Sequence, residues 1–179
     1  IGVYKTTNSG ITWIKLTGGL PGIWTGKTTI ELYKGNPNFV YASVANDFSY
    51  VGYYTSTDAG ITWALKTTGV GIGNQGWYNN AHLVKANDPN TIVVGTIDLV
   101  KSTNGGTSFT TKSNWNAWIT GATPPGEPES PSSNFAHADH HYVADNPLNP
   151  NKLYAITDGG LYRSNDFGET YYSCNGGFV

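Results

Sequence analysis

The densest group of potential metal ligands is the segment His137-Ala138-Asp139-His140-His141. Successive side chains of a β-strand point to opposite sides, so His137, Asp139 and His141 would share one side of a strand. Imidazole nitrogens and a carboxylate suit a divalent metal such as zinc. These residues are therefore a candidate metal site, and no other cofactor is expected. The alternative is that they form hydrogen bonds within the fold and bind no metal.

A second set of residues suits carbohydrate chemistry. Flat aromatic rings stack on the CH faces of sugars, and carboxylates accept hydrogen bonds from sugar hydroxyl groups. Candidates for this role are Trp24, Trp77, Trp115, Trp118, Asp47, Asp98 and Asp158. In the alternative interpretation, the tryptophans fill gaps between sheets and the aspartates cap turns.

Four copies of an eight-residue pattern, here called octads, run through the chain. Each has Ser or Thr at the first position, Asn or Asp at the third, Gly at the fifth and an aromatic residue at the eighth. The side chain of the third residue can accept hydrogen bonds from amides one to three residues on, and the glycine can take the positive φ of a tight turn. Repetition at this period is typical of propellers. The third residues, predicted to be structural, are Asn8, Asp58, Asn104 and Asp166.

Three strand-like segments precede each of the last three octads. They are β-branched and aromatic runs, and an Asn-Pro or Asp-Pro turn separates the first run from the second. A fourth strand is expected after each octad, which gives a four-stranded antiparallel sheet. The predicted strands cover 29–33, 39–44 and 52–55, then 81–84, 91–95 and 99–101, then 141–144, 152–156 and 160–163.

The strand order also predicts which residues share an end of the sheets. Strand direction alternates, so the octads and the Asx-Pro turns fall at one end. Loops between second and third strands, together with connections between sheets, fall at the other end. That end would collect the candidate aspartates and tryptophans. The last connection holds a proline-rich insertion, Thr123–Pro131, which is expected to be neither strand nor helix.

The octads resemble the Asp-box of BNR-type repeats, Ser-x-Asp-x-Gly-x-Thr-Trp, which occurs in sialidases, sortilin-type propellers and xyloglucanase-type glycoside hydrolases. The resemblance covers essentially the whole chain. It implies an all-β fold, a β-propeller fragment of about three four-stranded antiparallel blades with partial blades at both ends. The expected partner is the remainder of the same propeller. Within one domain over 1–179, residues 1–13 would end a preceding blade, 14–63, 64–109 and 110–171 would be successive blades, and 172–179 would begin the next connection.

The resemblance also implies candidate enzyme activities. A sialidase uses three arginines, and Arg163 is the only arginine in this chain. Xyloglucanase-type hydrolases use paired acidic residues, one of them in a motif like Arg-Thr-Asp-x-Gly-Gly-x-Tyr-Arg. The segment from Thr157 to Arg163 is similar but is one residue shorter before the glycine pair. Asp158 is thus a candidate catalytic carboxylate. Glycoside hydrolysis needs a second catalytic carboxylate, which the sequence does not identify.

The composition excludes several kinds of partner. A net charge of -2 and a pI of about 6.0 supply no basic field for nucleic acid. No run of about 18 apolar residues predicts a membrane span, so direct membrane insertion is not expected. The single cysteine, Cys174, allows no internal disulfide.

The leading interpretation is a non-catalytic binding or display module of a secreted or cell-surface bacterial protein. Its ligand would be a glycan or a surface protein. Propellers host many functions, so two alternatives stay open. One is part of a xyloglucanase-like glycoside hydrolase, and the other is a structural repeat of a surface filament or adhesin.

Overall fold

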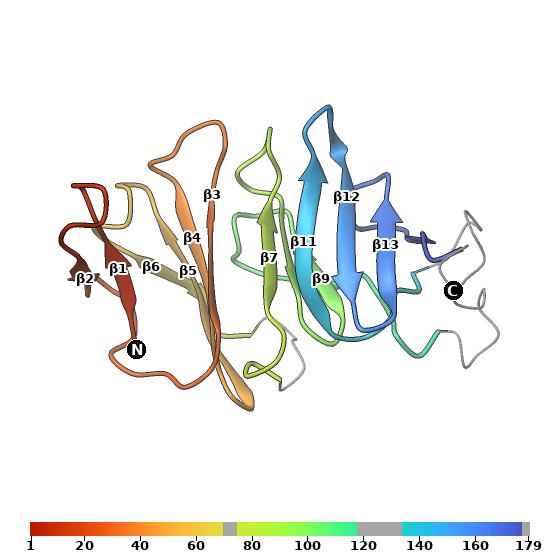
Figure 1. The fold of residues 1–179 in the computed structure, drawn as a ribbon, viewed down its shortest axis with the longest axis horizontal. Coiled ribbons are helices and arrows are strands. Elements are labelled where there is room, and N and C mark those ends of the chain that lie inside the picture. Colours follow the sequence, from red (N-terminus) through yellow and green to blue (C-terminus); the bar gives the residue numbers. More distant parts are fainter. Residues whose placement is uncertain (70–74, 118–133, 177–179) are drawn as a thin grey trace.

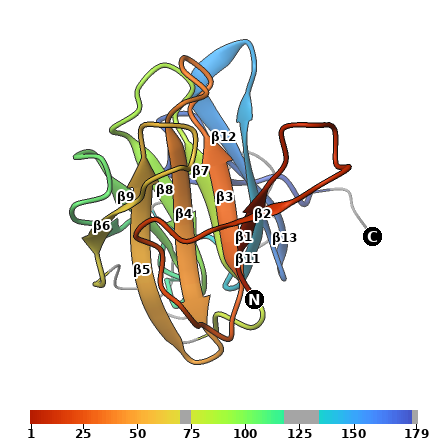
Figure 2. The same cartoon turned by 90° about the vertical axis from the view of Figure 1, so that its left-hand side faces the viewer.

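The computed structural model describes residues 1–69, 75–117 and 134–176. Within these ranges all regular structure is β, and no helix is long and apolar enough to span a membrane. Four antiparallel sheets stand side by side (Figure 1). Viewed from the N-terminal sheet, they lie one behind the other (Figure 2). The predicted all-β propeller architecture is confirmed.

The N-terminal sheet is a partial blade, and the other three sheets are complete four-stranded blades. The partial blade contains β1 (Val3–Lys5) and β2 (Ile14–Leu16). The first blade contains β3 (Thr28–Leu32), β4 (Val40–Asn46), β5 (Ser49–Ser56) and β6 (Ala64–Thr67). The second contains β7 (Ala81–Val84), β8 (Ile92–Gly95), β9 (Leu99–Ser102) and β10 (Thr110–Thr111). The third contains β11 (His140–Asn146), β12 (Asn149–Thr157), β13 (Gly160–Ser164) and β14 (Tyr172–Ser173).

The last strand of each sheet follows its octad and pairs with the strand before the octad. The sheets therefore end after β2, β6, β10 and β14, a few residues later than the expected boundaries at 13, 63, 109 and 171. Tyr172 and Ser173, expected in the next connection, form β14 of the third blade. The blade is thus complete within the described residues.

Strand alternation sorts the connections as the sequence predicts. The β3–β4 and β11–β12 turns lie at the top in Figure 1, and the β4–β5 and β12–β13 turns lie at the bottom. The end that carries the β4–β5, β8–β9 and β12–β13 turns is called the loop end below. The opposite end is called the octad end.

Hydrogen bonds from the third residue shape each octad turn. In the second octad, Asp58 Oδ1 accepts from the Thr62 amide at 2.9 Å and from Ser56 Oγ at 2.7 Å, and Asp58 Oδ2 accepts from Thr62 Oγ1 at 2.6 Å. Ser56 Oγ accepts from the Gly60 amide at 2.9 Å. The main amide partner is thus four residues on, one beyond the predicted range. Equivalent bonds surround Asn8, Asn104 and Asp166.

Two successive residues in each octad have a positive φ. The fifth-position glycines have φ between 85° and 89°. Residues with a side chain rarely adopt a φ in this range, so glycine is expected at this position. The residue before each glycine is also left-handed, which the sequence did not predict. These residues are Ser9, Ala59, Gly105 and Phe167.

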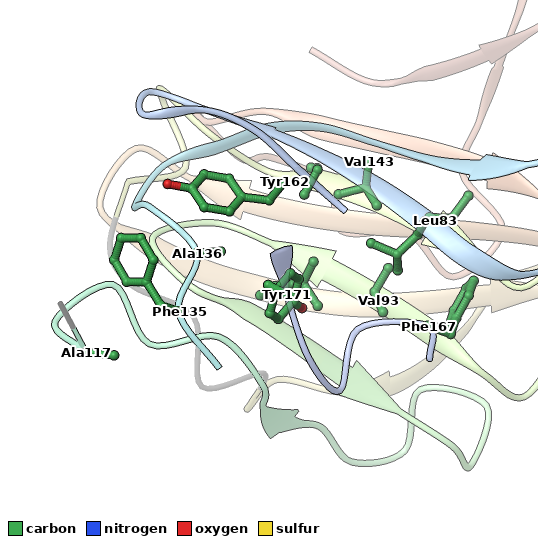
Figure 3. Packing of buried hydrophobic residues seen from close by; sticks show 13 residues of the cluster. Leu83, Val93, Ala117, Phe135, Ala136, Val143, Tyr162, Phe167 and Tyr171 are labelled. Carbon is green, nitrogen blue, oxygen red and sulfur yellow. The ribbon is translucent and has the colours of Figure 1, made fainter. Parts of the chain in front are cut away.

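The core lies between neighbouring blades. Tyr41, Tyr53 and Ile92 pack between the first and second blades. Between the second and third, Leu83 and Val93 face the third blade (Figure 3). Burial of such aliphatic and aromatic side chains supplies the main favourable free energy of folding. Each of the last three octads contributes to the interface with the sheet before it.

Replacing Asp166 with Ala should lower the free energy of unfolding by about 1–2 kcal/mol, because the Glu169 and Thr170 amides and the Thr170 hydroxyl lose their shared acceptor. Urea denaturation would measure the change. Asp166→Asn is the matched control and should lose less, since Asn serves in the first and third octads. Asn8→Ala should also cost less, because the aromatic residue of that octad, Trp13, is 60% exposed, whereas Tyr171 of the fourth octad is buried. Equal stability of Asp166→Ala and the parent would contradict this account.

Acid should weaken the second octad through Asp58. Hydrogen bonds from the Thr62 side chain, the Thr62 amide and the Ser56 side chain lower the pKa of Asp58 to about 2, from an ordinary value of 3.8. Because the folded pKa lies below the unfolded one, the contribution is present above pH 3.8 and is lost as pH falls through about 2. Denaturation at several pH values should show a steeper loss for the parent than for Asp58→Asn. Identical pH profiles would refute the assignment.

Candidate functional site

Asp158 lies in the β12–β13 hairpin at the loop end, where two glycines keep the turn tight. A Cβ at Gly159 would lie 2.3 Å from His137 Cγ, and a Cβ at Gly160 would lie 2.2 Å from Asn175 Oδ1. Asn175 also accepts a hydrogen bond from the Leu161 amide at 2.8 Å and donates to the Gly159 carbonyl at 2.9 Å. The hairpin is therefore held against both the segment before β11 and the segment after β14.

The Asp158 carboxylate joins two separate segments of the chain. Its Oδ1 lies 2.6 Å from His141 Nε2, on β11 of the same blade. Tyr78 Oη, from the connection between β6 and β7, donates to both carboxylate oxygens at 3.1 Å. The Tyr78 and His141 rings meet edge to face, with centroids 4.8 Å apart. Asp158, His141 and Tyr78 form one cluster, called the Asp158 cluster below.

Within the cluster, Asp158 stays ionised. The hydrogen bond from His141 is the main reason that the pKa of Asp158 lies below its usual value, and Tyr78 adds to the effect. The same contact with Asp158 raises the pKa of Tyr78, which stays a neutral donor. An ionised carboxylate can accept hydrogen bonds or act as a base or nucleophile. It cannot serve as the general acid, which needs a raised pKa.

The aromatic candidates differ in exposure. Trp77 is 53% exposed, and its ring lies 5.1 Å from the Tyr78 ring at an angle of 36°. Trp115 is also exposed, in the segment after β10. Trp24 is only 3% exposed and packs with Val44 and other core residues, so here it fills a gap and its ring faces no solvent. Trp118 lies outside the described residues, as does Thr123–Pro131.

The other two candidate aspartates lie in turns of the loop end. Asp98 Oδ1 accepts hydrogen bonds from Ser113 Oγ and from the Trp115 amide, both at 3.0 Å. Burial raises the pKa of Asp98, and these hydrogen bonds oppose that rise. Asp47 is half-buried in the β4–β5 turn, where its amide donates to Thr25 Oγ1 at 3.1 Å. Asp98 therefore caps the segment that carries Trp115.

The three candidate metal ligands each have other contacts. His137 Nδ1 lies 3.1 Å from the Ala138 carbonyl oxygen, Asp139 Oδ1 accepts from Asn79 Nδ2 at 2.7 Å, and His141 pairs with Asp158. Asp139 has a φ of 68° and precedes β11, so the strand alternation assumed for these residues does not hold. Among the described residues, no group of three His, Cys, Asp or Glu side chains is placed to hold a metal ion.

Sequence reasoning missed Tyr78 and the residues that position it. The Lys27 amide donates to the Gly76 carbonyl at 2.7 Å, and Asn80 Nδ2 donates to the Lys27 and Ser43 carbonyls, both at 3.1 Å. These bonds fasten the β6–β7 connection to the first blade. The signal in the sequence is the adjacent pair Trp77-Tyr78, in which a second aromatic residue with a hydroxyl group follows the candidate tryptophan.

Comparisons with known proteins agree with the architecture. No protein-family model matches the sequence, and no curated protein resembles it in sequence. Over 96% of its length, the chain aligns with the GH74 enzyme of Niastella koreensis (TM-score 0.65, 21% identity) and the GH74 xyloglucanase of Xanthomonas campestris (0.64, 18%). An ancestral GH74 enzyme aligns over the same share (0.61, 18%). The chain covers 26%, 27% and 21% of these structures, respectively, about a quarter of their length. At these identities, the likeness establishes the fold alone.

Removing the His141 imidazole should raise the pKa of Asp158 towards its usual value, because the largest stabilising contact of the carboxylate disappears. An NMR titration of the Asp158 carboxyl carbon in His141→Ala would measure the shift. Tyr78→Phe removes a weaker donor and should give a smaller rise. An unchanged pKa in His141→Ala would show that the contact does not form in solution.

Proposed function

We propose that this chain is part of a non-catalytic β-propeller module that binds glycan at its loop end, in a secreted or cell-surface protein. One observation carries the proposal: the exposed Trp77 ring lies against Tyr78, which is hydrogen-bonded to the ionised Asp158. A flat ring next to fixed polar groups suits a sugar, whose CH face is apolar and whose edge carries hydroxyl groups.

The contacts of the carboxylates favour binding over catalysis. Asp158 is ionised, so it could only be the base or nucleophile of a hydrolase. Asp98 has a raised pKa, as a general acid requires. However, Asp98 Oδ1 accepts two hydrogen bonds that hold Ser113 and the Trp115 amide. Its position therefore suits a structural role better than proton donation to a leaving group.

We also propose that the four octads are Asp-boxes of the BNR type. The support is that one set of bonds recurs in all of them: the first-position hydroxyl accepts from the glycine amide, and the third-position side chain accepts from the amide four residues on. The turns concerned contain Asn8, Asp58, Asn104 and Asp166.

A hydrolase is the second candidate function. It is favoured by the fold shared with GH74 enzymes and by the opposite pKa shifts of Asp98 and Asp158. Turnover of xyloglucan, followed as released reducing ends, would distinguish the candidates. We expect none from the full chain. Turnover that Asp158→Asn abolishes, while binding persists, would replace the binding proposal with the hydrolase.

Trp77→Ala should weaken binding of a xyloglucan oligosaccharide at least about fivefold, because it removes the exposed stacking surface. Calorimetric or NMR titration of the full chain would measure the affinity. Leu148→Ala is the control, since this residue is also an exposed apolar side chain but lies in the β11–β12 turn at the octad end. Equal affinity of Trp77→Ala and the parent, or no binding by the parent, would overturn the proposal.

A further inference from the structure

Two lysines and a glutamate join the second blade to the third at the octad end. Lys101 Nζ lies 2.9 Å from Glu169 Oε1, and Lys112 Nζ lies 2.7 Å from Glu169 Oε2. Glu169 is the sixth residue of the fourth octad. Lys101 Nζ also lies 5.7 Å from the centroid of the Phe167 ring, which is at the fourth position of the same octad. A carboxylate and an aromatic ring thus occupy the octad end of this interface.

The same places between the first and second blades hold smaller residues. Thr55 precedes the second octad as Lys101 precedes the third. In the third octad, the fourth position is Gly105 and the sixth is Thr107. The Thr107 hydroxyl donates to the Asn104 carbonyl of its own octad at 3.1 Å, so this side chain turns back on its own turn. These positions therefore supply neither an aromatic ring nor a carboxylate to the interface.

A pocket of about 220 Å³ takes the place of these larger groups. Thr55 and Gly105, the two smaller residues, both line it. The pocket is called the Lys66 pocket below. Its polar wall contains Thr55, Thr57 and Lys66, and its apolar wall contains Phe39, Tyr41 and Pro89.

Lys66 supplies the charge of this pocket. It comes three residues after the last residue of its octad, Trp63, as Lys112 does after Phe109. The two lysines therefore have equivalent places in successive blades. Lys112 binds the Glu169 carboxylate, whereas Lys66 is exposed and has no ion pair in the part of the chain that the structure describes. An ammonium group on a pocket wall attracts an anion.

Two polar groups near the pocket are already paired. Tyr41 Oη donates to the Pro89 carbonyl at 2.9 Å. The Asp88 carboxylate accepts from the Asn90 amide at 2.9 Å and from the Thr91 hydroxyl at 2.6 Å, within its own turn. The polar wall adds the hydroxyl groups of its two threonines, which can donate to a carboxylate beside the lysine.

We propose that the Lys66 pocket binds an acidic side chain of a partner protein. The carboxylate takes the place that Glu169 has one interface further on. It pairs with the Lys66 ammonium and accepts hydrogen bonds from the Thr55 and Thr57 hydroxyls, while its methylene groups lie along the apolar wall. The occupant of the equivalent place is itself a glutamate side chain, which favours a protein over an acidic glycan as the partner. The pocket lies at the octad end, so this binding does not depend on glycan binding at the loop end.

An NMR titration of the full chain with N-acetylglutamic acid α-methylamide, which carries a single side-chain carboxylate, tests the proposal. Saturable shifts are expected at the Thr57 and Gly105 amides. The matching glutamine compound should bind at least about threefold more weakly, because it lacks the charge of the ion pair. Lys66→Gln should cause a similar loss, and Lys66→Arg should retain binding. Lys15→Gln removes one charge from another exposed lysine, on β2, and should bind like the parent.

A substitution in the third octad gives a second test. Thr107→Glu supplies the carboxylate that this octad lacks, so it should pair with Lys66 and abolish binding of the glutamate compound. Thr107→Gln is nearly equal in size but uncharged, and it should still bind. Circular dichroism should show that both variants are folded. No saturable shift in the parent, or equal binding by the parent, Lys66→Gln and Thr107→Glu, would overturn the proposal.

A sugar acid distinguishes a protein partner from an acidic glycan. Methyl galacturonide carries its carboxylate on a pyranose ring, whose hydroxyl groups would lie on the apolar wall of the pocket. We therefore expect it to bind more weakly than the glutamate compound in the same NMR titration. Tighter binding of methyl galacturonide, lost in Lys66→Gln, would overturn the assignment of the pocket to a protein partner.

Discussion

The acceptor oxygen of the third octad residue is the constraint on which the rest of the structure depends. It binds the amide four residues on and thereby replaces strand hydrogen bonds that are lost at the turn. Two left-handed residues then fit in the middle of the turn, and the eighth residue enters the interface with the preceding blade, as Trp63 and Tyr171 do. A local hydrogen bond thus fixes how one sheet packs on the next.

The Asp158 cluster depends on this packing. Tyr78 and Asp158 are 80 residues apart, in the β6–β7 connection and the β12–β13 turn, yet they share a hydrogen bond. A change in the angle between blades would separate them. Asn80 and Asp139 also fix the position of the loop end. Asn80 donates to the Ser43 carbonyl on β4, and Asp139 accepts from Asn79, so each residue binds a connection between blades to a neighbouring segment. The loop end is therefore positioned by the interfaces below it.

The sequence predicts the features that repeat and misses those that depend on the rotation between sheets. Octad spacing predicted three four-stranded blades, and alternation predicted the end at which Asp158 and Trp77 lie. Alternation failed for Asp139, because a left-handed residue breaks the strand before β11. The burial of Trp24 and the contact of Tyr78 with Asp158 arise from neighbouring blades. The period predicts the order of the strands but does not give the rotation between sheets, on which the burial of Trp24 and the contact of Tyr78 depend.

The division between the two ends explains how such a scaffold can change its ligand without losing its fold. Octad residues at one end hold each turn and each interface, so their substitution acts on stability. Trp77 at the loop end is 53% exposed, so changing it removes less buried surface than changing a core residue would. Asp158 differs from Trp77, because its bond to Tyr78 joins the third blade to the connection between the first and second blades. Within one site, the aromatic surface is thus free to vary, whereas the carboxylate is constrained by the architecture as well as by any ligand.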